Sequence, residues 1–150
     1  MKLTSPAFPH RGTLPKIYTC QGKGISPPLD FADVPREALS LVLIMDDPDV
    51  PAFVRKDQMW DHWVVFNIPP DTKHFAEGKT PPGVQGNNTD GEAEYQGPCP
   101  PDREHRYFFH LYALDTCLDL EPGATKHAVL SALEGHVITR TELVGLYKKD

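Results

Sequence analysis

Proline is the residue that most constrains what this chain can fold into. Sixteen of the 150 residues are proline, and they are spread along the whole sequence. Proline has no backbone N–H to donate and holds φ at about −65°, so it ends helices and stays out of central strands. The prolines therefore predict many turns and short strands and leave little room for long helices.

Four apolar or alternating segments lie between the turns and predict β-strands. Segment 40–47, SLVLIMDD, is almost continuously apolar, which indicates a buried strand. Segments 60–68, WDHWVVFNI, and 104–115, EHRYFFHLYALD, are rich in aromatic and β-branched residues. Segment 136–147, HVITRTELVGLY, repeats apolar and β-branched residues at a period of two and predicts a further strand.

One segment, TKHAVLSALEG, has the pattern of a helix. Val129, Ala132 and Leu133 form an apolar face at helical spacing. Thr125 is placed to cap the helix, and Gly135 is placed to end it. Many strands, one short helix and abundant turns indicate a mostly β domain, a sandwich or barrel whose strands are mainly antiparallel.

Length and charge narrow the class of protein further. A chain of 150 residues suits a single domain covering residues 1–150. The formal net charge of −6 argues against nucleic-acid binding, which needs clustered lysine and arginine. No apolar run is long enough for a transmembrane segment, and MKLTSPAFPH lacks the apolar region of a signal peptide. We therefore expect a cytoplasmic protein.

The three cysteines, Cys20, Cys99 and Cys117, include no CxxC pair. An odd number at these spacings argues against a disulfide framework or a zinc site, so we expect reduced thiols. A contact between Cys20 and Cys99 stays open, because both lie in loops rich in glycine and proline.

Polar side chains occur where three of the predicted strands meet loops. They are Asp47 and Asp49 in DPDVP, Trp60 and His62 in WDHW, and His105 and Tyr107 in HRY. Each has an ordinary structural explanation when taken alone, since aspartate stabilises turns and a single buried histidine is usually structural. One end of a sheet, however, can bring all three sets together.

Together these groups have the chemistry of a small anion site. Histidine and tyrosine donate hydrogen bonds to phosphate-type oxygens, and aspartate fixes a histidine tautomer or favours its protonated form. The loop YQGPCPP adds backbone N–H groups at Gly97 and Cys99. A metal site is less favoured because no HxH or HxxxH pair is present, and no cofactor motif is found. We therefore expect no metal and no cofactor.

Segment 69–103 consists almost entirely of turn-forming and polar residues. It is too long for an idle connector in a compact domain, which marks it as a functional candidate.

The ordered set of motifs resembles the phosphatidylethanolamine-binding proteins, also called Raf kinase inhibitor-like proteins, and especially their short bacterial and archaeal branch. The matching segments are CQGKGISPPLDFADVP, DPDVP with WDHWVVFNIP, GNNTDGEAEYQGPCPP with HRYFFHLYALD, and EGHVITRTELVGLY. They cover nearly the whole chain in the same order, which makes the set far more specific than any one segment.

The resemblance implies two antiparallel sheets in a β-sandwich-like fold, one or two short helices, and an anion-binding pocket at one end. Carried over motif by motif, it implies a binding site of Asp47, Asp49, Pro51, Trp60, His62, Gly97, His105 and Tyr107. The family has no common enzymatic mechanism, so we expect a non-catalytic binding protein for a small phosphorylated or anionic ligand. Bacterial members also suggest a homodimer. Mammalian members add a C-terminal helix near the pocket, whereas this sequence stops just after its closing strand.

Two other functions stay open. One is a hydrolase or phosphoryl-transfer enzyme in which a histidine acts as general base and Asp47 orients it. Against it, no serine or cysteine nucleophile lies in a recognisable motif. The other is a regulator of kinase or protease partners acting through segment 69–103, which is compatible with anion binding.

Overall fold

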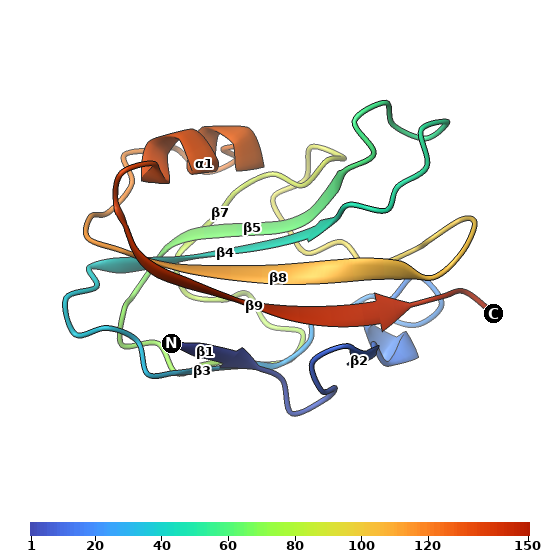
Figure 1. Cartoon of the computed structure of the whole chain (residues 1–150), viewed down its shortest axis with the longest axis horizontal. Coiled ribbons are helices and arrows are strands. Elements are labelled where there is room, and N and C mark those ends of the chain that lie inside the picture. Colours follow the sequence, from blue (N-terminus) through green and yellow to red (C-terminus); the bar gives the residue numbers. More distant parts are fainter.

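Two β-sheets and one α-helix are stacked in three layers (Figure 1). The computed structural model describes residues 1–150. The larger sheet has the order β2 (Gly12–Thr13), β9 (Val137–Tyr147), β8 (His105–Leu114), β4 (Ser40–Asp47), β5 (Trp60–Ile68) and β7 (Val84–Gln85). The smaller sheet has the order β1 (Lys2–Thr4), β3 (Leu29–Ala32) and β6 (His74–Phe75). The helices are α1 (Lys126–Leu133) and the 3₁₀ turn η1 (Lys16–Tyr18).

The sandwich of two sheets predicted from the sequence is confirmed. All neighbouring strands are antiparallel apart from β2 and β9, which form a parallel pair over two residues each. Strands β4 and β5 coincide residue for residue with the predicted segments 40–47 and 60–68. The short strands β6 and β7 lie inside segment 69–103, where the sequence predicts only loop.

Strand β4 is buried along its whole length because both faces of the larger sheet are covered. Leu41, Leu43 and Met45 belong to a cluster of 19 buried residues that fills the space between the two sheets. Val42 and Ile44 point the other way, into a cluster of nine buried residues beneath α1. The alternation of side chains along a strand thus explains why an almost continuously apolar sequence is needed here.

Helix α1 begins and ends as its sequence predicts. The Thr125 side chain accepts a hydrogen bond of 3.1 Å from the Ala128 amide, which caps the first turn. Gly135 has a φ of +82°, the left-handed conformation that commonly follows a helix. Val129 and Leu133 are buried against the larger sheet. With eight residues in α1, no helix of the protein could cross a bilayer.

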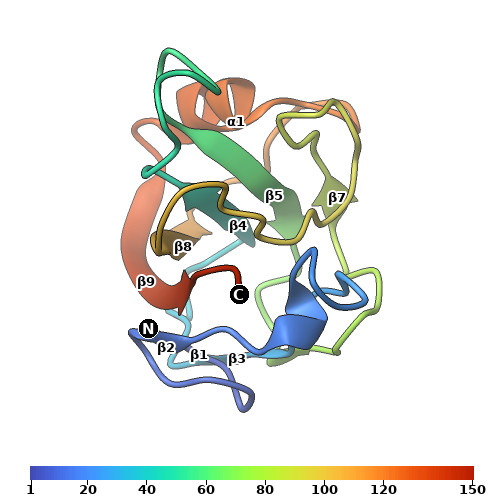
Figure 2. The same ribbon diagram turned by 90° about the vertical axis from the view of Figure 1, so that its right-hand side faces the viewer.

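The strand order brings three chain segments to one end of the larger sheet. Strand β4 runs antiparallel to both β5 and β8, so its last residues lie beside the first residues of its two neighbours. Asp47 is paired with Trp60, and Asp46 is paired with Phe108. This end lies at the right of Figure 1 and faces the viewer in Figure 2, where loops 48–59 and 86–104 surround the strand ends.

Candidate functional site

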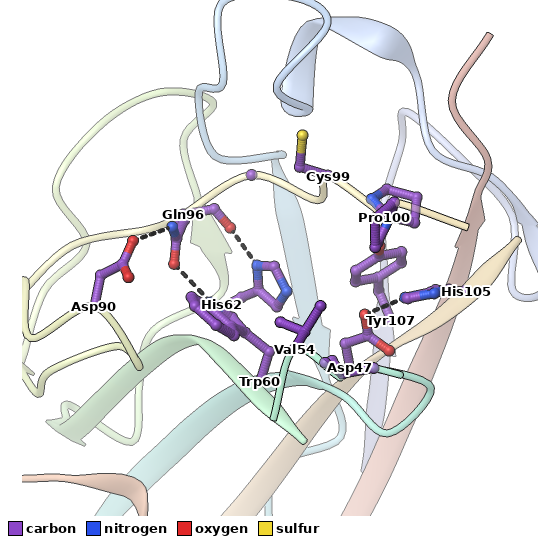
Figure 3. Close-up of a pocket in the computed structure, with 13 residues that line it drawn as sticks. Asp47, Val54, Trp60, His62, Asp90, Gln96, Cys99, Pro100, His105 and Tyr107 are labelled. Carbon is purple, nitrogen blue, oxygen red and sulfur yellow. Dashed lines mark hydrogen bonds and ion pairs between the residues drawn. The ribbon is translucent and has the colours of Figure 1, made fainter. Parts of the chain in front are cut away.

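A cavity of about 340 Å³ opens at this end of the larger sheet (Figure 3). Strands β4, β5 and β8 and the two surrounding loops supply its walls. Its lining residues are Asp47, Val50, Val54, Trp60, His62, Asp90, Gln96, Gly97, Cys99, Pro100, Pro101, His105 and Tyr107. Six of the eight residues proposed from the sequence are among them, so the structure brings these six together.

Asp47 and His105 form a buried pair at the back of the cavity. The Nδ1 atom of His105 lies 2.6 Å from Oδ2 of Asp47, and Nε2 lies 2.7 Å from Oδ1 of Asp102. The other oxygen of Asp47 accepts a 2.7 Å hydrogen bond from the Asp49 amide. Burial raises the pKa of Asp47, while the hydrogen bond with His105 acts in the opposite direction. Both ring nitrogens of His105 are thus occupied by carboxylates within the protein.

His62 is held by the loop in front of it. Its Nδ1 atom lies 2.7 Å from the backbone oxygen of Gln96, and because a carbonyl only accepts, Nδ1 is the donor. The residue is only 5% exposed. This burial lowers the pKa of His62 to about 4, so the ring is neutral at pH 7. The second ring nitrogen, Nε2, is turned toward the cavity in Figure 3.

Tyr107 is fully buried, yet its hydroxyl has no hydrogen-bond partner within the protein. The ring of His62 meets the Tyr107 ring edge-on, with centroids 5.4 Å apart. Burial, followed by the charge of Asp47 and a long contact between its carboxylate and the hydroxyl, raises the pKa of Tyr107. The hydroxyl therefore stays protonated at physiological pH and keeps its capacity to donate.

A chain of hydrogen bonds fixes the outer wall. The indole N–H of Trp60 donates to the side-chain oxygen of Gln96 at 2.8 Å. The amide nitrogen of Gln96 in turn donates to Asp90 at 2.6 Å (Figure 3). Gln96 therefore positions Trp60 through its side chain and His62 through its backbone.

Gly97 lies where two chain segments meet too closely for a side chain. A Cβ atom at this position would come within 2.8 Å of the Tyr18 carbonyl oxygen. The Tyr95 hydroxyl donates to the same oxygen at 2.8 Å, and the Cys20 amide donates to Pro98 at 3.0 Å. The requirement for glycine here is thus a packing requirement. The Gly97 and Cys99 amides donate no hydrogen bond within the protein.

The expectation of three reduced thiols is wrong for two of the cysteines. Cys20 and Cys99 form a disulfide with a Cα–Cα distance of 5.4 Å, and only Cys117 is free. The pairing joins segments separated by 79 residues, which meet only after folding. The disulfide holds the loop that carries Gln96 and Gly97 against the segment around η1.

Asp49 and Pro51 lie outside the cavity. Asp49 accepts hydrogen bonds from the backbone amide, Nε and Nη2 of Arg106, at 2.9, 2.9 and 2.8 Å. The carbonyl of Pro51 accepts from the amides of Val54 and Arg55, which shapes the turn after β4. Both residues support the wall containing Asp47 and Val54 and do not themselves line the cavity.

Several lining or supporting residues were not identified from the sequence. They are Val50, Val54, Asp90, Gln96 and Asp102. No local pattern distinguishes them from ordinary loop residues, although three lie in segment 69–103, whose length and composition mark it as a functional candidate. No lysine or arginine lines the cavity. Binding of an anion would therefore depend on hydrogen-bond donors.

Comparison with known proteins places this architecture in a family. The sequence model for phosphatidylethanolamine-binding proteins matches residues 4–148. A UPF0098 protein of Chlamydia trachomatis is 56% identical over 150 residues, which cover all of both chains. A UPF0098 protein of Methanothermobacter thermautotrophicus is 54% identical over 155 residues, which cover 99% of each chain.

Two crystal structures agree with this assignment. One, described as the phosphatidylethanolamine-binding protein homologue CT736 of Chlamydia trachomatis, has a TM-score of 0.96 at 56% identity, covering 99% of this chain and 97% of that chain. The other, Escherichia coli YbcL, described as a member of the mammalian family, has a TM-score of 0.89 at 28% identity, covering 99% and 98%. The chain therefore belongs to the phosphatidylethanolamine-binding protein family.

Proposed function

We propose that this protein is a non-catalytic binding protein whose cavity takes a small phosphate- or phosphoester-type anion. The observation that carries the proposal is the Tyr107 hydroxyl, a fully buried donor in the cavity wall with no partner in the protein. Buried polar groups are rarely left unpaired, so this hydroxyl is a candidate contact for a ligand oxygen. Gly97 and Cys99 also line the cavity, and their backbone amides, which have no partner in the protein, are two further donors.

The family name supports the same class of ligand. Phosphatidylethanolamine carries a phosphate in its headgroup, and the proposal needs only that shared chemistry. The apolar side chains of Val50 and Val54 and the ring of Trp60 offer room beside the anion for a substituent. We therefore assign the site to a phosphate-bearing group and not to one particular molecule.

A hydrolase or phosphoryl-transfer enzyme has less support. No serine or threonine lines the cavity, and the sulfur of Cys99 is held in the disulfide. The two ring nitrogens of His105 are both engaged, so this histidine offers no free base. His62 keeps Nε2 free, but burial lowers its pKa to about 4, which makes it a weak base at pH 7.

A regulatory role toward a protein partner is a compatible extension. Phe53 is 81% exposed on loop 48–59, next to Val54 in the cavity wall. An exposed aromatic ring on a loop that lines a cavity is a candidate contact for a partner that presents a phosphorylated side chain. A pull-down whose captured partner is released by added phosphate would support this extension.

Titration followed by NMR tests the proposal. Inorganic phosphate and phosphoethanolamine are added up to millimolar concentration while the signals of His62 and Tyr107 are followed. We expect both to shift and saturate, and the signal of His110, on the opposite face of the sheet, to stay in place. Absence of any shift at His62 and Tyr107 would refute the proposal. Turnover of p-nitrophenyl phosphate that is lost in His62→Ala would favour the enzyme instead.

A further inference from the structure

His62 presents a hydrogen-bond acceptor to the cavity and not a donor. Its only ring proton lies on Nδ1, because the Gln96 carbonyl 2.7 Å away can only accept. The neutral ring therefore has a lone pair on Nε2, the nitrogen turned toward the cavity in Figure 3. A ligand atom placed against Nε2 must bring a proton to form a hydrogen bond.

The carboxylates around the cavity disfavour a ligand with more than one negative charge. Carboxylates face the cavity from β4, through Asp47, and from loop 86–96, through Asp90. From β8, Tyr107 contributes a neutral hydroxyl. Both ring nitrogens of His105, on the same strand, contact carboxylates of the protein. Burial is the main influence on the pKa of His62 and lowers it; Asp46, on the other face of β4, and Asp90 raise it, while His105 lowers it further. No lysine or arginine lines the cavity.

A fully ionised oxyanion fits such a site poorly. Each of its oxygens carries only lone pairs, so one of them would oppose the lone pair of His62, with Asp47 and Asp90 nearby. Burial also keeps His62 from taking up a proton, since its pKa is lowered to about 4. An oxyanion with one P–OH group avoids this conflict, because that group donates to Nε2 while the other oxygens accept from donors such as Tyr107.

We infer that the cavity selects oxyanions that carry a proton of their own, and that it binds the monoanion of a phosphomonoester in preference to its dianion. The inference rests on the proposed function, because it names the ionic form that the same site accepts. His62 is the residue that sets this selectivity, and Gln96 is the positioning residue that fixes the His62 tautomer.

Three small anions distinguish the effect of a proton on the ligand from the effect of the ligand's charge. Methyl phosphate at pH 5.5 is mainly a monoanion with a P–OH group, since the second pKa of a phosphomonoester is about 6. Dimethyl phosphate has the same charge without the proton, and sulfate has neither the proton nor the single charge. Affinity for each is measured by calorimetry or by the fluorescence of Trp60 at pH values from 5.5 to 7.5.

We expect methyl phosphate to bind at least roughly tenfold more tightly than the other two at pH 5.5, the effect of one hydrogen bond to a charged ligand. Its affinity should fall roughly twentyfold by pH 7.5 as the monoanion disappears. Equal affinity for all three anions would overturn the inference and leave anion binding intact. Tighter binding of sulfate as the pH falls would overturn it too, because the proton would then come from solvent to His62. Failure of all three to bind would refute the proposed function itself.

A variant pair locates the selectivity. His62→Gln places an amide N–H within reach of the ligand, so the preference for methyl phosphate over sulfate should fall to about threefold or less. His110→Gln changes a histidine on the opposite face of the sheet and should keep the full preference. Unchanged selectivity in a folded His62→Gln protein would overturn the role of His62. If this variant does not fold, the three-anion series on the unmodified protein still decides the inference.

Discussion

Two side chains in the cavity wall keep a hydrogen-bonding atom free, whereas His105 and Trp60 beside them do not. The hydroxyl of Tyr107 has no partner, and Nε2 of His62 is turned toward the cavity. By contrast, both ring nitrogens of His105 bind carboxylates, and the indole N–H of Trp60 binds Gln96. An unpaired buried polar group costs about 1–3 kcal/mol of stability. Such a cost at the wall of a cavity is typical of a binding position.

Replacing Tyr107 with phenylalanine should therefore separate stability from binding. The variant removes an unsatisfied hydroxyl, so the free energy of unfolding should stay the same or rise by up to about 1 kcal/mol. Affinity for phosphate should fall about tenfold or more, because a donor to a charged ligand is lost. Urea denaturation and phosphate titration measure the two effects.

Tyr112→Phe, on the opposite face of the sheet, is the control and should leave affinity unchanged. Unaltered phosphate affinity in Tyr107→Phe would remove the hydroxyl from the site.

Asp49 provides the opposite case, a residue of the DPDVP motif that lies outside the cavity. Asp49→Asn removes the charge that pairs with the half-exposed Arg106 and weakens the hydrogen bonds between the two side chains. Ion pairs at such positions contribute about 0–1 kcal/mol, so unfolding should be only slightly easier. Phosphate affinity should stay within about twofold of the original. A tenfold loss of affinity in a stable Asp49→Asn protein would show that Asp49 contacts the ligand.

At the scale of elements, two links hold the loops and the helix in place around the larger sheet. The Cys20–Cys99 disulfide fixes the loop that carries Gln96 and Gly97. On the other face, Lys126 at the start of α1 lies 3.1 Å from Asp46 on β4 and 2.7 Å from Asp61 on β5. Each link joins segments that are far apart in the sequence, so each is expected to stabilise the native fold.

Opening the disulfide should weaken both the fold and the site. Cys20→Ser should lower the free energy of unfolding by about 2–4 kcal/mol, because the unfolded chain regains the freedom that the closed loop removes. Phosphate affinity should fall as well, since Gln96 holds both His62 and Trp60. Both sulfurs belong to exposed residues, so a reductant should have the same effect on the unmodified protein. Cys117→Ser is the matched control and should change neither quantity. Stability that is insensitive to reduction would contradict this prediction.

The Lys126 link predicts a specific dependence of stability on pH. Burial opposes ionisation of Asp46, but the contacts with His110 and Lys126 outweigh it and lower the pKa of Asp46. A lowered pKa adds stability above the unfolded value of about 3.9, and this contribution is lost as the pH falls through the folded value. Lys126→Met should therefore cost about 3 kcal/mol at pH 7 and clearly less at pH 3.

The control for this link is Lys16→Met, which removes a fully exposed partner of Asp150. Denaturant midpoints of both variants are measured from pH 7 to pH 3. Lys16→Met should follow the unmodified protein throughout. A cost of Lys126→Met that is the same at both ends of this range would contradict the assigned role of the ionised Asp46.

At the scale of the whole molecule, the main core belongs to both sheets at once. Phe31 and Phe75 from the smaller sheet pack in the same cluster as Trp63 and Phe109 from the larger one. Phe75 contacts both Phe31 and Trp63, with ring centroids 4.8 and 5.8 Å apart. Neither sheet can bury its inner face without the other.

The shared core predicts a single cooperative unfolding transition. Tryptophan fluorescence, which includes the buried Trp63, and far-ultraviolet circular dichroism should give the same midpoint in urea. This result would agree with one domain over residues 1–150. Two separate midpoints would mean that one sheet unfolds independently of the other, contrary to this expectation.

The elements that the sequence predicts well are those whose signals are contained in consecutive residues. The period of side chains in β4 and β5, and the cap and terminal glycine of α1, are local features, so their positions could be predicted almost to the residue. The resemblance to the family added the two-sheet fold with a pocket at one end. Polar residues at three predicted strand ends had already suggested that one end of a sheet can bring them together. His105 and Tyr107 lie on one face of β8 because their spacing is two.

Only the tertiary structure decided which polar atoms of the site lack a hydrogen-bond partner within the protein. The disulfide, the two carboxylates on His105 and the Gln96 carbonyl on His62 all depend on how long loops fold over the sheet end. The separation of Asp47 from Asp49 likewise depends on Arg106 lying close enough to hold Asp49 outside. The sequence by itself determined the long strands, helix α1 and six of the residues that meet at one end of the larger sheet. Contacts between distant segments, for which no local pattern exists, decided which of those residues keep an atom available for a ligand.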